Sequence, residues 1–389
     1  MTESRTSADV VIVGGGVIGA SVAWHLARGG CTDVLVIDAA PRSGQGSTGR
    51  ATGGFRAQFG SAPNIRLSLL SRDALRRFAD DTGVDPGYAP VGYLFLARED
   101  AELEVLMEAQ ALQHAMGLHE ARRVDADEAR AINPAIRGEI AGGTFCPTDG
   151  YIRPLEILRG YTEAARRLGV RFAFDTPCTG LRSEGDAVRA VRTPRGEVAA
   201  GCVVNAAGAW AGRIAEMAGV HLPVRPLRRQ VALTAPCDLL PADMPMTIFC
   251  DDGFHLRVRD GHVLLLWPDE PAGDDPFAAE VEDGWVDDVL RRARERLPCL
   301  RDAVIDRAGC WAGLYEMSPD HHVLLGPSPG IPNLYLANGS SGHGVMHSPA
   351  IGRLLAEIIL HGAARSMDVH PLRPGRFAEG EPIAGSALL

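Results

Sequence analysis

Glycines near the N-terminus have the spacing of a phosphate-binding loop. Gly14, Gly16 and Gly19 fit the pattern G-x-G-x-x-G, which follows a strand predicted at Val10–Val13 and opens a helix predicted at Ile18–Arg28. The first glycine permits a tight turn, the second lets a pyrophosphate approach the backbone, and the third lets helix and strand pack closely. The anion then lies on the free N–H groups at the positive end of the helix. The segment therefore predicts a dinucleotide site.

The residues that follow this motif favour FAD over NAD. Asp38 ends a strand predicted at Val34–Ile37 and is placed to accept hydrogen bonds from ribose hydroxyls. A nicotinamide-binding domain would continue with further β-α repeats at this point. The chain instead has a loop rich in Gly, Ser and Thr over Pro41–Gly60. Such a loop can lay backbone N–H groups along a longer dinucleotide.

Several segments spread along the chain match one family of flavoenzymes. They are Val11–Gly19, Gly46–Arg50, Val203–Trp210, Trp311–Asp320 and Asn338–Gly344. Through them the chain resembles the D-amino-acid-oxidase-like superfamily of FAD-dependent oxidoreductases over nearly its whole length. Within that superfamily it is most similar to the branch of sarcosine oxidase, dimethylglycine dehydrogenase and the catalytic subunits of archaeal proline dehydrogenases.

The resemblance implies a set of FAD contacts. Ser47 and Thr48 would line the pyrophosphate and ribityl chain, and Cys178 would offer its backbone to the adenine side. Residues 342–346 would place N–H groups near the flavin pyrimidine, where a helix N-terminus stabilises negative charge on the reduced ring. The full expected set is Gly14, Gly16, Val17, Ile18, Gly19, Asp38, Ala39, Ser47, Thr48, Gly53, Gly54, Cys178, Ala207, Gly208, Trp210, Gly313, Gly342, His343, Gly344, Val345 and Met346.

Two positions depart from the family pattern for covalent flavin. Monomeric sarcosine oxidases attach the flavin through a cysteine at the position of Gly313. Multi-subunit relatives attach a second flavin through a histidine at the position of Pro154. Neither nucleophile is present here. We therefore expect FAD to be bound non-covalently, with no second flavin.

The reaction implied by the resemblance is oxidation of the C–N bond of a secondary amine or amino acid, either N-alkyl or cyclic. A hydride passes to flavin N5, and the resulting imine hydrolyses. Arg56 matches a family arginine that grips the substrate carboxylate, which a guanidinium binds through two parallel hydrogen bonds. Met346 replaces the lysine that completes this clamp in sarcosine oxidases, and Arg257 is the candidate for the second anchor. His255 and His343 are further candidates to face the flavin.

The electron acceptor remains open between oxygen, a quinone and an electron-transfer protein. The chain has no lysine, so all 39 basic residues are arginine. Sarcosine-oxidase-like enzymes hold a lysine ammonium over flavin N5, where its charge assists the reaction with oxygen. The missing lysine favours a dehydrogenase, although a proteome-wide preference for arginine explains the same composition. Two other functions also stay open: a non-catalytic flavoprotein assembly factor and an FAD-dependent 2-hydroxy-acid oxidoreductase.

The order of predicted elements indicates a mixed α/β fold. Strand and helix alternate at both ends of the chain, and strands that suit a more antiparallel sheet lie between them. We expect a discontinuous, Rossmann-like FAD-binding domain with an inserted, mostly antiparallel substrate-binding domain. The expected FAD-binding pieces are 1–80, 145–220 and 305–389, and the substrate-binding pieces are 81–144 and 221–304.

Composition limits the partners. The formal net charge of −10 argues against a nucleic-acid groove or an anionic membrane surface, because both require a basic face. The eight cysteines include no C-x-x-C pair, and the adjacent His321 and His322 do not share a face, so we expect buried free thiols and no metal site. No membrane span or signal peptide is apparent, which predicts a cytoplasmic protein, as a homo- or hetero-oligomer or alone.

Overall fold

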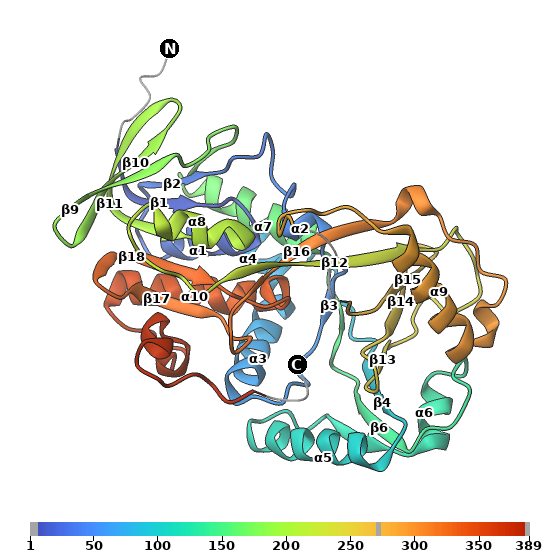
Figure 1. The fold of residues 1–389 in the computed structure, drawn as a ribbon. Coiled ribbons are helices and arrows are strands. Elements are labelled where there is room, and N and C mark those ends of the chain that lie inside the picture. Colours follow the sequence, from blue (N-terminus) through green and yellow to red (C-terminus); the bar gives the residue numbers. More distant parts are fainter. Residues whose placement is uncertain (1–6, 270–273, 386–389) are drawn as a thin grey trace.

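The first sheet is built on the short apolar segments that flank the glycine loop. The computed structural model describes residues 7–269 and 274–385. The strand order is β17-β18-β11-β1-β2-β8, with the β9-β10 hairpin attached to β11 (Figure 1). All neighbours from β18 to β8 are parallel, and β17 is antiparallel to β18. The strands are β1 (Ser7–Val13), β2 (Val34–Ile37), β8 (Arg171–Ala173), β9 (Gly180–Glu184), β10 (Ala187–Thr193), β11 (Gly196–Asn205), β17 (Leu324–Ser328) and β18 (Ile331–Asn338).

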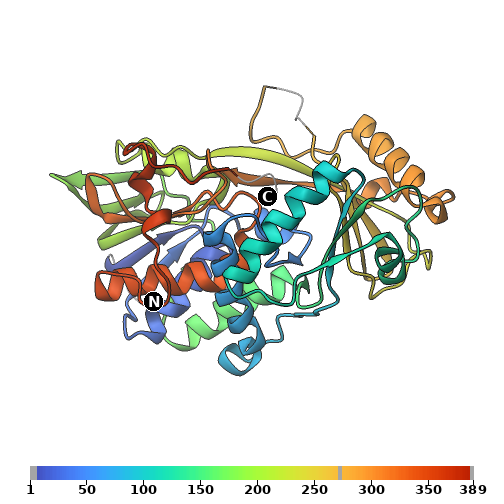
Figure 2. The same ribbon diagram turned by 90° about the horizontal axis from the view of Figure 1, so that it is seen from below.

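Alternate side chains of β1 enter two different cores, as a strand requires. Val10 and Ile12 pack against a helical layer on one face, and Val11 and Val13 pack with α8 (Ala211–Glu216) and the β9-β10 hairpin on the other. Figure 2 shows this helical layer below the sheet. It consists of α1 (Val17–Arg28), α3 (Ala62–Arg76), α7 (Pro154–Arg167) and α10 (Gly344–His361).

The second sheet forms the other lobe, in the order β16-β12-β15-β14-β13-β4-β6-β5. Its pairs are antiparallel except for β13 with β4. The strands are β4 (Tyr93–Ala97), β5 (Arg122–Val124), β6 (Gly142–Cys146), β12 (Arg225–Leu233), β13 (Met246–Phe249), β14 (His255–Arg259), β15 (His262–Leu266) and β16 (Trp311–Met317).

Helices cover the two faces of this sheet unequally. On one face, Trp285 and Val289 of α9 (Asp283–Arg296) pack with Leu256 and Leu265, and α6 (Ala126–Ile132) joins the same core. On the other face, α5 (Asp100–Ala115) packs on Tyr93 and Phe95. The rest of that face is left for the cavity described below.

Short elements complete the described chain. They are α2 (Ser47–Arg50), α4 (Phe78–Thr82), the two-stranded sheet of β3 (Gly54–Phe55) and β7 (Gly150–Tyr151), and 3₁₀ turns at Gly208–Trp210, Pro298–Leu300, Arg307–Gly309, His370–Leu372 and Pro374–Phe377.

The mixed α/β fold with a parallel sheet and a largely antiparallel second sheet is confirmed. One boundary differs from the expected division. β16 lies in the piece 305–389 that we assigned to the FAD-binding domain, yet it pairs with β12 in the second sheet. These two long strands run from one lobe into the other (Figure 1). The second sheet therefore ends beside the glycine loop.

Proline is favoured in the first turn of a helix, so Pro349 in the sequence predicts that the last helix begins there. The helix begins earlier. α10 starts at Gly344 and carries Pro349 in its interior. A proline there lacks the N–H that would bond to the carbonyl four residues before it. The Ser348 hydroxyl donates to that carbonyl, Val345 O, at 2.9 Å. This hydrogen bond replaces the missing one and lets the helix continue.

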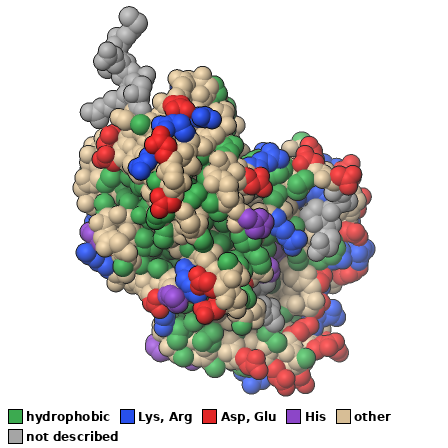
Figure 3. All heavy atoms as spheres, turned by 60° about the vertical axis from the view of Figure 1, so that its left-hand side comes forward, with side chains coloured by type: hydrophobic (Ala, Val, Ile, Leu, Met, Phe, Trp, Pro, Cys, Tyr) green, Lys and Arg blue, Asp and Glu red, His purple; other side chains and the backbone are tan. Residues whose placement is uncertain are grey.

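The surface carries mixed charge. Basic and acidic side chains are interspersed on the face shown in Figure 3. No helix within residues 7–269 and 274–385 is long and apolar enough to cross a membrane. The eight cysteines are all free, but only Cys146 is buried and Cys299 is exposed, so the expectation of buried thiols was wrong for most of them.

Candidate functional site

A cavity of about 1120 Å³ lies between the lobes. Its wall includes the glycine loop after β1, the 42–56 segment, and strands β12, β13, β15 and β16. Pockets for one drug-sized ligand usually measure about 300 to 1,000 Å³. This cavity therefore has room for a dinucleotide and for a second small molecule.

The glycine loop is closed by contacts that leave no space for side chains. Gly14 has a φ of +110°, and a Cβ on it would lie 2.3 Å from Ala206 O. A Cβ on Gly19 would lie 2.0 Å from Gly14 O. A Cβ on Gly16 would meet only Thr48 Oγ1, at 3.4 Å, and Gly16 lines the cavity. Gly14 and Gly19 thus shape the turn, and Gly16 keeps the space in front of α1 free.

Side chains from the following segments hold this loop in place. Asp38 Oδ2 accepts the Gly15 N–H at 2.7 Å, and Asp38 Oδ1 accepts the Ala40 N–H at 2.8 Å. Thr48 Oγ1 accepts the Val17 N–H at 3.1 Å. Asp38 therefore fixes the loop while it also lines the cavity.

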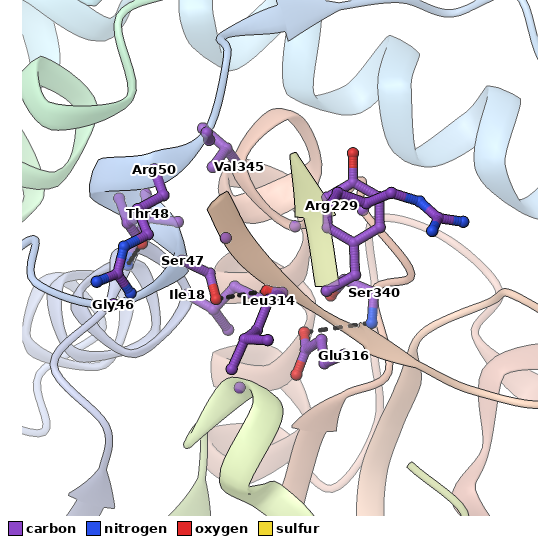
Figure 4. A pocket seen from close by; sticks show the side chains of 18 of the residues that line it. Ile18, Gly46, Ser47, Thr48, Arg50, Arg229, Leu314, Glu316, Ser340 and Val345 are labelled. Carbon is purple, nitrogen blue, oxygen red and sulfur yellow. Dashed lines mark hydrogen bonds between the residues drawn. The ribbon is translucent and has the colours of Figure 1, made fainter. Parts of the chain in front are cut away.

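The α2 turn connects the first lobe to β16. The Ser47 hydroxyl donates to Leu314 O at 2.7 Å, as Figure 4 shows. The Trp311 indole N–H donates to Arg50 O at 2.8 Å. A Cβ on Gly313 would lie 3.0 Å from Arg50 Cβ, so the two segments are in close contact. These bonds fix the second sheet relative to the glycine loop.

The cavity brings together nearly all residues expected to contact FAD. Gly19 is the exception, because it packs behind the loop against Gly14. On the wall are Gly14, Gly16, Val17, Ile18, Asp38, Ala39, Ser47, Thr48, Gly53, Gly54, Cys178, Ala207, Gly208, Trp210, Gly313, Gly342, His343, Gly344, Val345 and Met346.

Arg56 lies on the wall facing the second sheet. It is 6% exposed, and its guanidinium carbon lies 3.8 Å from the centroid of the Phe59 ring. Its Nη1 donates to Gln58 O at 2.5 Å, and its Nη2 lies 3.5 Å from His343 Nε2. Burial lowers the pKa of Arg56 to about 10. Within the described residues no carboxylate forms an ion pair with it.

A buried carboxyl group near Arg56 is already engaged. Asp149 is fully buried and accepts the Ala57 N–H at 2.8 Å and the Gln58 side-chain N–H at 3.2 Å. Burial raises its pKa to about 6, and these hydrogen bonds act against that rise. Asp149 thus fixes the segment that carries Arg56 and leaves the guanidinium available to a ligand.

The two expected histidines also reach the cavity. His343 precedes α10 and contacts the Phe59 ring edge to face, with centroids 4.8 Å apart. Burial lowers the pKa of His343 well below its usual value, and the nearby Arg56 adds to the effect. Its Nδ1 has no hydrogen-bond partner among the described residues. His255 Nδ1 lies 2.8 Å from Gly253 O, and burial lowers its pKa as well.

Arg257 is not brought to the cavity wall. Its guanidinium lies 3.5 Å from the centroid of the Tyr151 ring, and its Nη1 donates to Thr52 O at 2.8 Å and Gly53 O at 3.0 Å. Its donors therefore stabilise the loop beneath the cavity. The expectation of Arg257 as a direct second anchor does not match this geometry.

Among the cavity residues that the sequence analysis did not single out are Arg229, Tyr315 and Glu316. Tyr315 and Glu316 lie within the family segment Trp311–Asp320, so a signal was present. Glu316 is 9% exposed and accepts the Ser340 N–H at 3.2 Å (Figure 4). Burial raises its pKa to about 7.

The residues present fit a bound dinucleotide. The cavity is lined by residues of both lobes, and its glycines leave backbone N–H groups accessible. His343 Nδ1 is buried without a hydrogen-bond partner among the described residues, so a bound ligand can supply one. No group of His, Cys, Asp or Glu in the described part of the chain could hold a metal ion.

Comparisons with known proteins support this assignment. The chain is 31% identical to FAD-dependent oxidoreductase domain-containing protein 1 of Bos taurus, over 98% of this chain and 87% of that protein. It is 28% identical to the mitochondrial dimethylglycine dehydrogenase of Mus musculus, over 97% of this chain but 45% of that protein. The crystal structure of L-proline dehydrogenase from P. horikoshii superimposes with a TM-score of 0.91 at 28% identity, covering 98% of this chain and 100% of that one.

A family model offers a further comparison. The model described as FAD dependent oxidoreductase matches residues 9–358, which include the glycine loop, both sheets and most of α10. Because this match spans most of the sequence and the fold agrees, the chain belongs to the FAD-dependent oxidoreductase (DAO) family.

Proposed function

We propose that this protein oxidises the C–N bond of a secondary amine or amino acid, N-alkyl or cyclic, with non-covalent FAD, giving an imine that water then hydrolyses. The observation that carries the proposal is Arg56: a buried guanidinium without an ion pair among the described residues, on the wall of the same cavity as the glycine loop. Several relatives have amine or amino-acid names, including dimethylglycine dehydrogenase and L-proline dehydrogenase.

The glycine-loop half of the cavity is the proposed FAD site. The N–H groups at the start of α1 would hold the pyrophosphate, and the α2 turn with Ser47 and Thr48 would flank it. When bound, FAD supplies the oxidant for the C–H bond beside the amine nitrogen. Gly313 has no nucleophile, and Pro154 is the first residue of α7, so the expected attachment positions offer no bond to the flavin.

Arg56 is proposed to bind the substrate carboxylate and to favour the reactive form of the amine. Only a neutral amine has a free lone pair, and a nearby positive charge disfavours protonation of the nitrogen. His343 beside Arg56 stays neutral near pH 7, since its pKa lies well below the usual value. Because the Arg56 guanidinium can only donate, His343 Nε2 accepts from it and the neutral ring carries its proton on Nδ1. This unpartnered Nδ1–H is available to donate a hydrogen bond to a ligand.

The apolar side chains around Arg56 would exclude water from the reacting centre. Tyr93 and Phe95 of β4 are both buried and line the cavity beside Met246 and Ile248 of β13. A dry site strengthens the charge-assisted bond between guanidinium and carboxylate. It also protects the imine until the product leaves.

The test is anaerobic bleaching of the visible flavin band by N-alkyl amino acids, cyclic imino acids and 2-hydroxy acids. We expect at least one amine to reduce the flavin and the hydroxy acids to leave it oxidised. Reduction by a hydroxy acid alone, or by no compound, would overturn the proposal. Acid precipitation of the same protein should release all its flavin as free FAD, and yellow colour retained in the pellet would refute the non-covalent assignment.

A further inference from the structure

A second guanidinium lies in the half of the cavity that faces the second sheet. Arg229 is on β12, directly opposite Gly313 of β16, and it lines the cavity. Its neighbour Arg228 points to the other face, where it is buried and forms an ion pair with Glu282. Strand alternation therefore directs Arg229 towards the ligand space.

Arg229 has backbone partners and no acidic one. Its Nη1 donates to Asp269 O at 2.8 Å and to Arg228 O at 3.3 Å. Across residues 7–269 and 274–385 no carboxylate pairs with it. In Figure 4 its side chain extends away from the Gly46–Arg50 turn. It is therefore available to a ligand other than the FAD pyrophosphate.

The positive charges of Arg56 and Arg229 affect the same two side chains of the cavity, Tyr315 and His255. Burial raises the pKa of Tyr315, and the charges of Arg229 and Arg56 both oppose that rise. Burial lowers the pKa of His255, and the same two charges lower it further. Both side chains line the cavity. Two cations thus flank the volume in front of Tyr315 and His255.

The acidic side chains of the cavity wall lie elsewhere. The described wall includes two carboxyl groups, of Asp38 and Glu316. Asp38 is used by the glycine loop, and Glu316 accepts the Ser340 N–H. An amino acid with a neutral amine brings one negative charge, which leaves one of the two guanidinium groups without an anion. Arg56 is buried and Arg229 is half-buried, so an unpaired charge is costly at Arg56 and less costly at Arg229.

We propose that Arg229 is a second anion anchor and that the substrate is an amine bearing two carboxylates, such as an N-carboxymethyl or N-alkyl dicarboxylic amino acid. One carboxylate pairs with Arg56 and the other with Arg229. This inference rests on the proposed function, because it names the substrate class of that site.

The test compares two ligands that cannot be oxidised at nitrogen. Thiodiacetate carries two carboxylates on either side of a sulfur atom, and (methylthio)acetate carries one. Each is titrated into the FAD-loaded full-length protein at constant ionic strength, and the dissociation constant is read from the visible flavin band. We expect thiodiacetate to bind about tenfold more tightly, because its second carboxylate accepts charge-assisted hydrogen bonds from the half-buried Arg229.

Substitution at Arg229 assigns that preference. Arg229→Gln should remove the preference for thiodiacetate and leave the dissociation constant of (methylthio)acetate within about twofold. Arg229→Lys should restore part of it, and Arg189→Gln, at an exposed arginine on β10, should change neither constant. Retained FAD and an unchanged melting temperature show that each variant is folded.

Two results would overturn the inference. The first is that the wild-type protein binds thiodiacetate and (methylthio)acetate with equal dissociation constants. The second is that Arg229→Gln weakens the binding of both ligands to the same degree, which would mean that the two arginines share a single carboxylate. Either result leaves the proposed function standing if an amine still bleaches the flavin. If no amine bleaches it, the proposed function fails independently of the ligand preference.

Discussion

The two halves of the cavity are built in different ways. The half beside α1 is made of backbone groups: glycines that leave no room for side chains, held by Asp38 and Thr48. The half facing the second sheet is made of side chains from separate strands, with Arg56 and Arg229 among aromatic and apolar groups. A backbone site for a dinucleotide needs one continuous segment, whereas a side-chain site for a small molecule is assembled from several segments.

The halves also differ in how much they destabilise the ligand-free fold. Glycine N–H groups at a helix N-terminus are neutral and can be solvated in an open cavity. Arg56 holds a charge at 6% exposure without an ion pair among the described residues. A buried, unpaired charge destabilises a fold. An anionic ligand should therefore stabilise the half facing the second sheet more than the half beside α1. Variants in the two halves should lose different ligands.

The largest effect is expected in the backbone half. Gly16→Leu should abolish FAD binding, because the new side chain enters the space in front of α1 that Gly16 keeps open. A Cβ at this position meets no atom closer than 3.4 Å, so the chain should still fold. The measurement is the FAD content of the purified protein together with its circular dichroism spectrum.

The matched control for this variant is Gly284→Leu. Gly284 is exposed on α9, and a Cβ there has nothing within 4 Å. This variant should keep a full complement of FAD. A Gly16→Leu protein with stoichiometric FAD would contradict the placement of the dinucleotide on the glycine loop.

An intermediate effect is expected from Arg56→Leu in the side-chain half. The loss of a charge-assisted pair worth roughly 1.5 to 3 kcal/mol should raise the substrate dissociation constant by about one to two powers of ten, with FAD retained. The melting temperature without ligand should hold or rise, because an unpaired buried charge has been removed. An unchanged dissociation constant, measured by flavin titration beside Arg189→Gln, would move the anchor away from Arg56.

The smallest effect concerns Glu316 and stability. Burial raises its folded-state pKa to about 7, above the unfolded value. The native state therefore holds a proton that the unfolded chain loses as pH rises, so the wild type loses stability between the two pKa values. Glu316→Gln removes this loss and should gain on the order of 1 to 3 kcal/mol over wild type at about pH 8, and little at about pH 5.

Thermal melts of the FAD-free protein at the two pH values measure this difference. Glu104→Gln, at an exposed glutamate on α5, serves as the control and should show no pH-dependent gain. If Glu316→Gln differed from wild type by the same amount at both pH values, the carboxyl group would titrate normally in the fold.

The sequence predicted the backbone half far better than the other. β2 has the predicted bounds, Val34–Ile37, and α1 differs by one residue at its start. Such segments are set by local chemistry: β-branched runs, a glycine turn and a helix N-terminus. Local patterns also failed at α10, because Pro349 looks like a helix start until the Ser348 hydroxyl is seen to replace its missing hydrogen bond.

The side-chain half could be predicted only in part. Arg56 and His255 reach the cavity, but Arg257 shares its strand with His255 and is used by the carbonyls of Thr52 and Gly53 instead. Arg228 and Arg229 are adjacent in sequence, and only the register of β12 on β16 shows which one faces the cavity. The hydrogen-bond partners of long side chains come from segments that are distant in sequence, so a local sequence pattern does not predict them.

The most direct test of the division of the cavity is a crystal structure of the FAD complex with (methylthio)acetate. We expect the pyrophosphate at the N-terminus of α1, in front of Gly16, and the ligand carboxylate in hydrogen-bond contact with the Arg56 guanidinium. A pyrophosphate away from the glycine loop would contradict the account. So would a carboxylate bound outside the half that Arg56 and Arg229 share.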